Sequence, residues 1–116
     1  MNRRRFGAEG ERAAREYLAA KGAAILEMNY RRPTGEIDII ARHRGVILFV
    51  EVKRRSTLRY GRPAEAVTPS KRARILGTAA LYLQEHGLED APARFDVMEI
   101  LPGGVRHIEN AFLAGE

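Results

Sequence analysis

Hydrophobic residues recur along this chain with two different periods, which together predict a mixed α/β fold. Helical spacing occurs in residues 7–22 and again in residues 69–86. Shorter apolar runs before and after the second helix predict five strands, at 23–30, 36–41, 46–53, 94–101 and 105–109. We therefore expect the order αβββαββ, with one mixed five-stranded sheet flanked by helices in a single domain of residues 1–116.

The second predicted helix has clear start and stop signals. Thr68 is a good N-cap, Pro69 suits the first helical position, and Gly87 follows the last turn. Its apolar positions place the buried face on Ala73, Leu76, Ala80 and Leu83.

Connection lengths predict how the strands pair. Residues 42–45 form a link short enough for a hairpin, so the second and third strands should be antiparallel. The helix at 69–86 then acts as a crossover that lays the fourth strand parallel to the third. Residues 56–67 show no hydrophobic period and contain glycine and proline. We therefore expect a loop, and a loop of that length is more often functional or mobile than idle.

Charged residues interrupt two of the apolar runs, in Gly35-Glu36-Ile37-Asp38-Ile39-Ile40 and in Glu51-Val52-Lys53. A buried charge is costly unless it is paired or bound to a metal. Strand alternation places Glu51 and Lys53 on one face of the third strand. Asp38 joins them only if paired residue numbers across the hairpin have an odd sum, which a two- or four-residue turn provides. The Cβ atoms of Asp38 and Glu51 would then lie about 5–8 Å apart.

A carboxylate pair beside an ammonium group suits metal-dependent cleavage of a phosphodiester. Asp38 and Glu51 would hold Mg²⁺ or Mn²⁺, the divalent ions that prefer carboxylate oxygens and water. Lys53 would position the attacking water or neutralise developing negative charge. The alternative is an exposed strand edge, where Glu51 and Lys53 form a solvated ion pair and Asp38 is a charge near a turn.

Two further glutamates are candidates for the same site. Glu11 is in line with Ala14 and Leu18 on the first helix and so borders its buried stripe, although an ion pair with Arg15 explains it equally well. Glu36 shares a strand face with Asp38, where it either assists at the metal or sits at a solvated strand end.

The charge balance favours a polyanionic partner. Lysine and arginine number 20 against 15 acidic residues, for a net charge of +5 and a pI near 10.1, and nucleic acid is the commonest such partner. A rim of basic residues with one tyrosine follows the candidate site: Arg54, Arg55, Arg59, Tyr60, Arg62, Lys71, Arg72 and Arg74. The arginines and lysine would hold phosphates, and Tyr60 would stack on a base. A solvated basic surface with a packed tyrosine remains the alternative.

Other sequence features narrow the class of protein. The chain has no cysteine, which excludes disulfides and thiolate chemistry, and its three histidines have no metal-binding spacing. No apolar run approaches the ~20 residues of a membrane span. Residues 1–5 include three arginines but are not followed by the long apolar stretch of a secretory signal, so we do not expect one. We expect a cytoplasmic protein without a membrane partner, and the sequence leaves open a homodimer.

Several motifs together resemble one known family. They are Gly7-x-x-Gly10-Glu11-x-x-Ala14, Tyr17-Leu18, Gly35-Glu36-Ile37-Asp38-Ile39-Ile40-Ala41, Phe49-Val50-Glu51-Val52-Lys53 and Asn110-Ala111-Phe112. Nearly the whole chain resembles the YraN-like uncharacterised protein family, which is grouped with the restriction-endonuclease-like PD-(D/E)XK nucleases and is similar to archaeal Holliday-junction resolvases. This resemblance implies that Asp38, Glu51 and Lys53 match the D, E and K of the nuclease signature. It also implies that Glu11 matches the helix-borne glutamate of the resolvases. Ile37 stands where the signature has proline.

The sequence thus predicts a small Mg²⁺- or Mn²⁺-dependent endonuclease, or a nuclease-like DNA-processing protein, that acts on structured or branched DNA. Its catalytic residues would be Asp38, Glu51, Lys53 and Glu11, with the metal held by Asp38, Glu51 and Glu11. The alternative is a non-catalytic nucleic-acid-binding module that retains the nuclease fold. A third reading is a protein-interaction scaffold.

Overall fold

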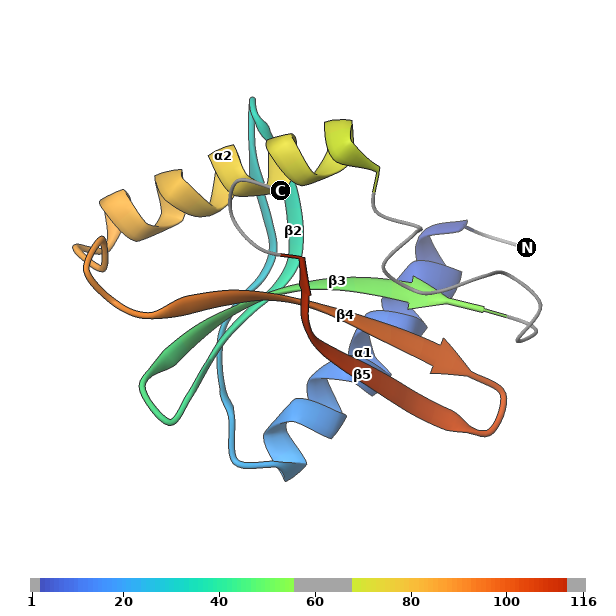
Figure 1. The fold of residues 1–116 in the computed structure, drawn as a ribbon. Coiled ribbons are helices and arrows are strands. Elements are labelled where there is room, and N and C mark those ends of the chain that lie inside the picture. Colours follow the sequence, from blue (N-terminus) through green and yellow to red (C-terminus); the bar gives the residue numbers. More distant parts are fainter. Residues whose placement is uncertain (1–2, 56–67, 113–116) are drawn as a thin grey trace.

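The computed structural model describes residues 3–55 and 68–112, with side chains from residue 9 onward, and Figure 1 shows their arrangement. The elements are α1 (Arg3–Ala20), β1 (Ala24–Arg32), β2 (Gly35–His43), β3 (Val46–Arg54), α2 (Pro69–Glu85), β4 (Ala93–Leu101) and β5 (Gly104–Phe112). The predicted order αβββαββ is confirmed. The loop predicted at 56–67 to be functional or mobile lies outside the described residues. Neither described helix is long and apolar enough to cross a membrane.

The five strands form one mixed sheet in sequence order, from β1 to β5. Among the described strands, only β3 and β4 are parallel neighbours, because α2 carries the chain back across the sheet between them. Strands β2 and β3 pair with Ile39 opposite Val50 and His43 opposite Val46, so the register has the odd sum that the site hypothesis requires. Arg44 and Gly45 form the two-residue turn, both at positive φ (52° and 81°), as in a type I′ hairpin.

Each face of the sheet is covered by one helix, as Figure 1 shows. On the α1 face, Ala14 and Leu18 pack against buried residues of the central strands, such as Leu48 and Val50. On the α2 face, Ile75 and Tyr82 belong to the cluster that contains Ile37, Ile40, Ile47, Phe49, Phe95, Val97 and Phe112. These two apolar layers fix both helices relative to the ends of β2 and β3.

The predicted buried face of α2 was wrong by about one position. Its buried residues are Ile75, Thr78, Ala79 and Tyr82, whereas Ala73 and Ala80 are exposed and Leu76 and Leu83 are partly buried. The hydrophobic pattern did not identify Thr78 as buried, because a residue with a hydroxyl group is usually expected at the surface. Its Oγ1 donates to the Arg74 carbonyl (2.8 Å) and shares a hydrogen bond with Thr34 Oγ1 (2.8 Å), which removes the cost of burial.

The hairpin of β1 and β2 twists sharply at Asp38. Ile37 belongs to the α2-side core and Ile39 to the α1-side core, although residues two apart in a regular strand share a face. On β1, Asn29 lies between the partners of these two residues and has φ 54°. Beyond the twist, the hairpin rises beside α2 (Figure 1).

Candidate functional site

The site lies at a fork between β2 and β3. Their ladder ends at the pair Ile39–Val50, and the next residue of β2 is Asp38. Its Oδ2 accepts a hydrogen bond from the Val52 backbone N–H at 2.8 Å, so a side-chain carboxylate replaces a backbone carbonyl. This contact fixes Asp38 against the segment of β3 that carries Glu51 and Lys53.

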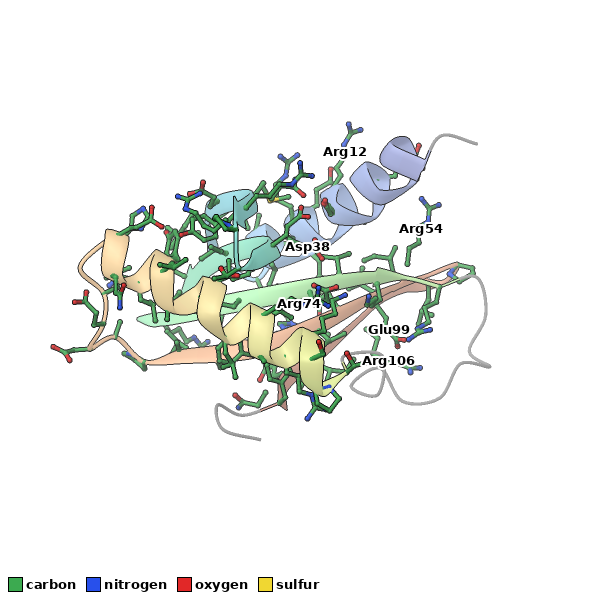
Figure 2. All side chains as sticks on the ribbon, turned by 90° about the horizontal axis from the view of Figure 1, so that it is seen from above. Arg12, Asp38, Arg54, Arg74, Glu99 and Arg106 are labelled. Atoms are coloured by element: carbon green, nitrogen blue, oxygen red, sulfur yellow. The ribbon has the colours of Figure 1, made fainter. Side chains whose placement is uncertain are left out.

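A cavity of about 200 Å³ opens at this fork. Seven residues line it: Gly35, Glu36, Asp38, Glu51, Lys71, Arg74 and Ile75. Its acidic residues come from β2 and β3, and its basic residues come from the first two turns of α2. Figure 2 places Asp38 between the two helices, with Arg74 on the α2 side. The two carboxylates predicted to converge, Asp38 and Glu51, therefore face one cavity.

Two ammonium groups contact the buried Glu51 carboxylate. Lys53 Nζ lies 3.3 Å from Glu51 Oε1, as its place two residues along β3 predicts. Lys71 Nζ donates to the same oxygen from the first turn of α2. The side chain of Glu51 is 9% exposed, whereas those of Lys53 and Lys71 are 28% and 31% exposed. The exposed strand edge considered as an alternative does not describe Glu51, which is a buried charge held by two cations.

Neighbouring carboxylates disfavour the ionised form of Asp38. Burial and the Glu51 carboxylate raise the pKa of Asp38 to about 7, against the Val52 amide, which lowers it. Glu11 and Glu36 raise the pKa further. Four acidic groups thus share one region, and additional positive charge there would stabilise it.

The pKa values of Lys53 and Lys71 shift in opposite directions. Burial, together with the neighbouring Lys71 ammonium, lowers the pKa of Lys53. Burial alone would lower the pKa of Lys71, but its hydrogen bond to Glu51 and the attraction of Glu51 and Asp38 raise it. Lys71 is accordingly the more firmly charged partner of Glu51, and Lys53 is the one closer to giving up its proton.

Glu11 reaches the same region from α1 but does not line the cavity. When the Asn29 side-chain amide is oriented to satisfy its own hydrogen bonds, its nitrogen donates to Glu11 Oε1 (2.8 Å) and Oε2 (3.0 Å) and to Glu36 Oε1 (3.2 Å). Burial and the charge of Glu36 raise the pKa of Glu11. Glu36 also pairs with Arg31 (3.2 Å), whereas the described side chains show no ion pair between Glu11 and Arg15.

The donor set fits a magnesium-type ion through two residues. Among the described residues, no group of three or more histidine or acidic side chains is close enough together to hold a metal. Mg²⁺ is usually held by one or two carboxylates with water and substrate phosphate, so Asp38 and Glu51 suffice for it. Glu11 does not line the cavity and is linked to Asp38 and Glu51 through charge.

The predicted basic rim is only partly described. Arg59, Tyr60 and Arg62 lie outside the described residues. Arg54 pairs with Glu9 (3.1 Å) and Arg55 with the buried Glu99 (2.7 Å), so these two arginines are engaged within the protein. Arg72 lies over the ring of Phe112 (5.5 Å to its centre). Lys71 and Arg74, one turn apart on α2, are the rim residues that line the cavity.

Sequence reasoning assigned Lys71 to the rim and missed its place on Glu51. One signal was available, because only three of the 20 basic residues are lysines: Lys21, Lys53 and Lys71. Two of these three contact one carboxylate oxygen. A compact ammonium group fits such a contact better than a planar guanidinium.

Comparison with known proteins identifies relatives along the whole chain. The model of the uncharacterised protein family UPF0102 matches residues 10–100, a span that holds Glu11, Asp38, Glu51, Lys53 and Lys71. The chain belongs to this family. A UPF0102 protein of Symbiobacterium thermophilum is 50% identical over 116 residues, covering 96% of this chain and 98% of the relative. A UPF0102 protein of Clostridioides difficile is 48% identical over 114 residues, covering 97% of this chain and all of the relative.

A third UPF0102 relative, from Thermodesulfovibrio yellowstonii, is 45% identical over 112 residues and covers 97% of this chain and 99% of its own length. The family's description names no activity. In this UPF0102 protein, the geometry and charge of the site are therefore the features that bear on function.

Proposed function

We propose that this protein is a nuclease of the PD-(D/E)XK type, which uses Mg²⁺ or Mn²⁺ to hydrolyse phosphodiesters of structured or branched DNA. One observation carries the proposal: Asp38 and Glu51 face a single cavity at the fork of β2 and β3, and Lys53 contacts Glu51 there. A pair of carboxylates with a lysine on the same strand face is the equipment that phosphodiester hydrolysis with a divalent ion needs.

Charge supports a nucleic-acid substrate. The protein carries a net charge of +5, and Lys71 and Arg74 form a basic wall of the cavity beside the carboxylates. Both residues lie near the N-terminus of α2, which Thr68 caps through its side chain and where the helix dipole favours a bound phosphate. A phosphodiester seated in the cavity would thus meet these cations as well as the carboxylates proposed to bind the metal.

Each residue has a role that follows from its place. Asp38 and Glu51 would hold the ion, and Asp38 is kept in position by the Val52 amide. A bound Mg²⁺ would polarise a phosphate oxygen and acidify a coordinated water. Lys53, whose pKa is lowered, would orient the attacking water or stabilise charge on the phosphate. Glu11 would act through Asn29 and Glu36.

The direct assay is cleavage of labelled duplex, nicked, flap and four-way-junction DNA with Mg²⁺, Mn²⁺ or EDTA. The parent protein should cut at least one substrate with metal and none with EDTA. Asp38→Asn and Glu51→Gln should each lower the rate at least about a thousandfold. Glu16→Gln, on the exposed side of α1, is the matched control and should cut at the parental rate.

The rival function is nucleic-acid binding without turnover, which the same basic charge favours. It predicts affinity for DNA or RNA that falls with salt, as phosphate contacts require, and that is indifferent to metal and to Asp38→Asn. Binding of that kind with no cleavage of any substrate would establish the rival. Absence of both binding and cleavage at moderate salt would contradict both proposals.

A further inference from the structure

Lys71 engages one of the two carboxylate oxygens through which Glu51 could hold a metal ion. Its ammonium group donates to Glu51 Oε1, while Lys53 contacts the same oxygen at 3.3 Å. An oxygen already engaged by two ammonium groups is poorly available to a divalent ion. Since Lys53 follows Glu51 on the same face of β3, its proximity is set by the strand; Lys71 reaches the carboxylate from a different element.

The backbone of Lys71 is held in place, but its side chain can adopt other conformations. Thr68 Oγ1 accepts the Lys71 backbone N–H at 3.2 Å, which fixes the first turn of α2. The lysine side chain is a flexible four-carbon stem, 31% exposed, and it lines the cavity beside Arg74. Its ammonium group can leave Glu51 by rotation of the side chain while the helix stays in place.

The charges in the cavity favour such an exchange. In the described structure, Lys71 offsets the mutual repulsion of Glu51 and Asp38. A divalent ion held by these carboxylates would supply twice that charge and repel the ammonium group. A phosphate in the same cavity would then be the nearest anionic partner for the displaced lysine, next to Arg74.

We propose that Lys71 is a built-in competitor of the metal: it pairs with Glu51 when the site is metal-free, and it moves to the substrate phosphate when the ion binds. This inference rests on the proposed function, and it adds a positioning residue outside the Asp38, Glu51 and Lys53 set. The ordinary alternative is a fixed ion pair that only attaches α2 to the sheet.

Calorimetric titration with Mn²⁺ alone separates these two roles. Lys71→Met should bind Mn²⁺ about tenfold or more tightly than the parent, because a unit positive charge beside the ion is removed. Arg74→Met removes a charge from the same wall without a contact to Glu51, and it should change the affinity less than about threefold. Equal affinity of the parent and Lys71→Met, or equal gains in Lys71→Met and Arg74→Met, would overturn the proposal.

A second measurement uses the parent protein and needs no substituted variant. With only three lysines in the chain, Nζ labelling gives three signals. Saturation with Mg²⁺ should move the Lys71 signal toward that of an exposed lysine and leave Lys21 unchanged. A Lys71 signal that stays fixed while Mg²⁺ binds would establish the static ion pair instead.

The Asp38→Asn variant distinguishes failure of this inference from failure of the nuclease proposal. Loss of Mn²⁺ binding in Asp38→Asn, with no gain in Lys71→Met, contradicts the competitor role alone. Undiminished Mn²⁺ binding in Asp38→Asn, or no binding by the parent and Lys71→Met alike, contradicts the metal site and the competitor role together.

Discussion

Asp38 accepts the backbone N–H of Val52 at 2.8 Å, a contact between the side chain of one strand and the main chain of its neighbour. At this point the β2–β3 ladder has ended, so the carboxylate satisfies an amide that would otherwise lose its partner. The same contact aims Asp38 at the segment that carries Glu51 and Lys53. Sheet geometry and site geometry therefore depend on one residue.

The stability of the metal-free protein should fall as pH rises from about 4 to 7. The folded-state pKa of Asp38 is about 7, well above its ordinary value of 3.8, so the native state keeps a proton that the unfolded chain has released. Asp38→Asn removes this penalty and keeps an acceptor for Val52. At pH 8 in EDTA the variant should be more stable than the parent by roughly 2 kcal/mol.

Urea unfolding at pH 5 and pH 8 measures this effect. The advantage of Asp38→Asn over the parent should be larger at pH 8 than at pH 5. The exposed Asp90→Asn is the control and should show no such pH dependence. An Asp38→Asn variant that is less stable than the parent at both pH values would contradict the raised pKa.

Gly35 should resist substitution because it begins β2 close to α2. Its φ is +151°, and a Cβ there would lie 3.2 Å from Thr78 Oγ1 and 3.4 Å from Arg74 Cβ. Gly35→Ala should therefore cost about 1–3 kcal/mol in the free energy of unfolding. Because Gly35 lines the cavity, cleavage should fall as well.

The matched control is Gly77→Ala, on the facing helix. A Cβ at Gly77 would meet Thr34 at an ordinary 3.9 Å, and alanine favours a helix, so this variant should gain about 0.5–1 kcal/mol. Thermal unfolding of both variants provides the comparison. Equal effects at the two glycines would show that the close approach at Gly35 has no energetic weight.

The buried carboxylate of Asp96 should stabilise the α1 face of the sheet above acidic pH. It accepts from His107 Nε2 (2.7 Å), Arg94 Nε (3.0 Å) and the Asn110 backbone N–H (3.1 Å). Burial alone would raise the pKa of Asp96, but these hydrogen bonds hold it below its ordinary value. Asp96→Asn should cost about 3 kcal/mol at pH 7.

A depressed folded-state pKa makes this contribution fully present above about pH 4 and lost as pH falls through the lower value. The difference between Asp96→Asn and the parent should therefore shrink in acid-unfolding experiments. Glu109→Gln breaks only an exposed contact with Arg94 (3.3 Å) and should cost less than about 1 kcal/mol. A constant difference between Asp96→Asn and the parent down to pH 2 would rule out ionised Asp96 as the cause.

Glu11 should matter for catalysis more than for folding. Its link to the cavity runs through Asn29, which also donates to the cavity residue Glu36. Glu11→Gln should lower the single-turnover cleavage rate about 10- to 100-fold while unfolding near the parental temperature. Parental cleavage by Glu11→Gln, matching Glu16→Gln, would remove Glu11 from the site.

The sequence predicted most of the architecture because local rules and long-range packing agree. Thr68 and Pro69 start α2, and the turn at Arg44 and Gly45 sets the register that places Asp38 beside β3. The α2 face was predicted wrongly because burial of Thr78 depends on Thr34, a residue 44 positions away. Tertiary hydrogen bonds of that kind leave no period in a sequence.

The site was predictable as far as strand geometry reaches. Alternation along β3 and the odd-sum register identify Asp38, Glu51 and Lys53 as neighbours. The contact of Lys71 with Glu51 depends on how the start of α2 lies over the sheet, and the Asn29 bridge depends on a positive φ in β1. Neither is encoded in the spacing of residues along one strand.

Anomalous scattering from crystals soaked in Mn²⁺ would show directly whether the fork of β2 and β3 binds a metal ion. We expect one strong peak between the Asp38 and Glu51 carboxylates, with Lys53 beside it and the Lys71 ammonium group displaced from Glu51. Absence of a peak at the fork of β2 and β3 at saturating Mn²⁺, with Lys71 still seated on Glu51, would contradict this expectation.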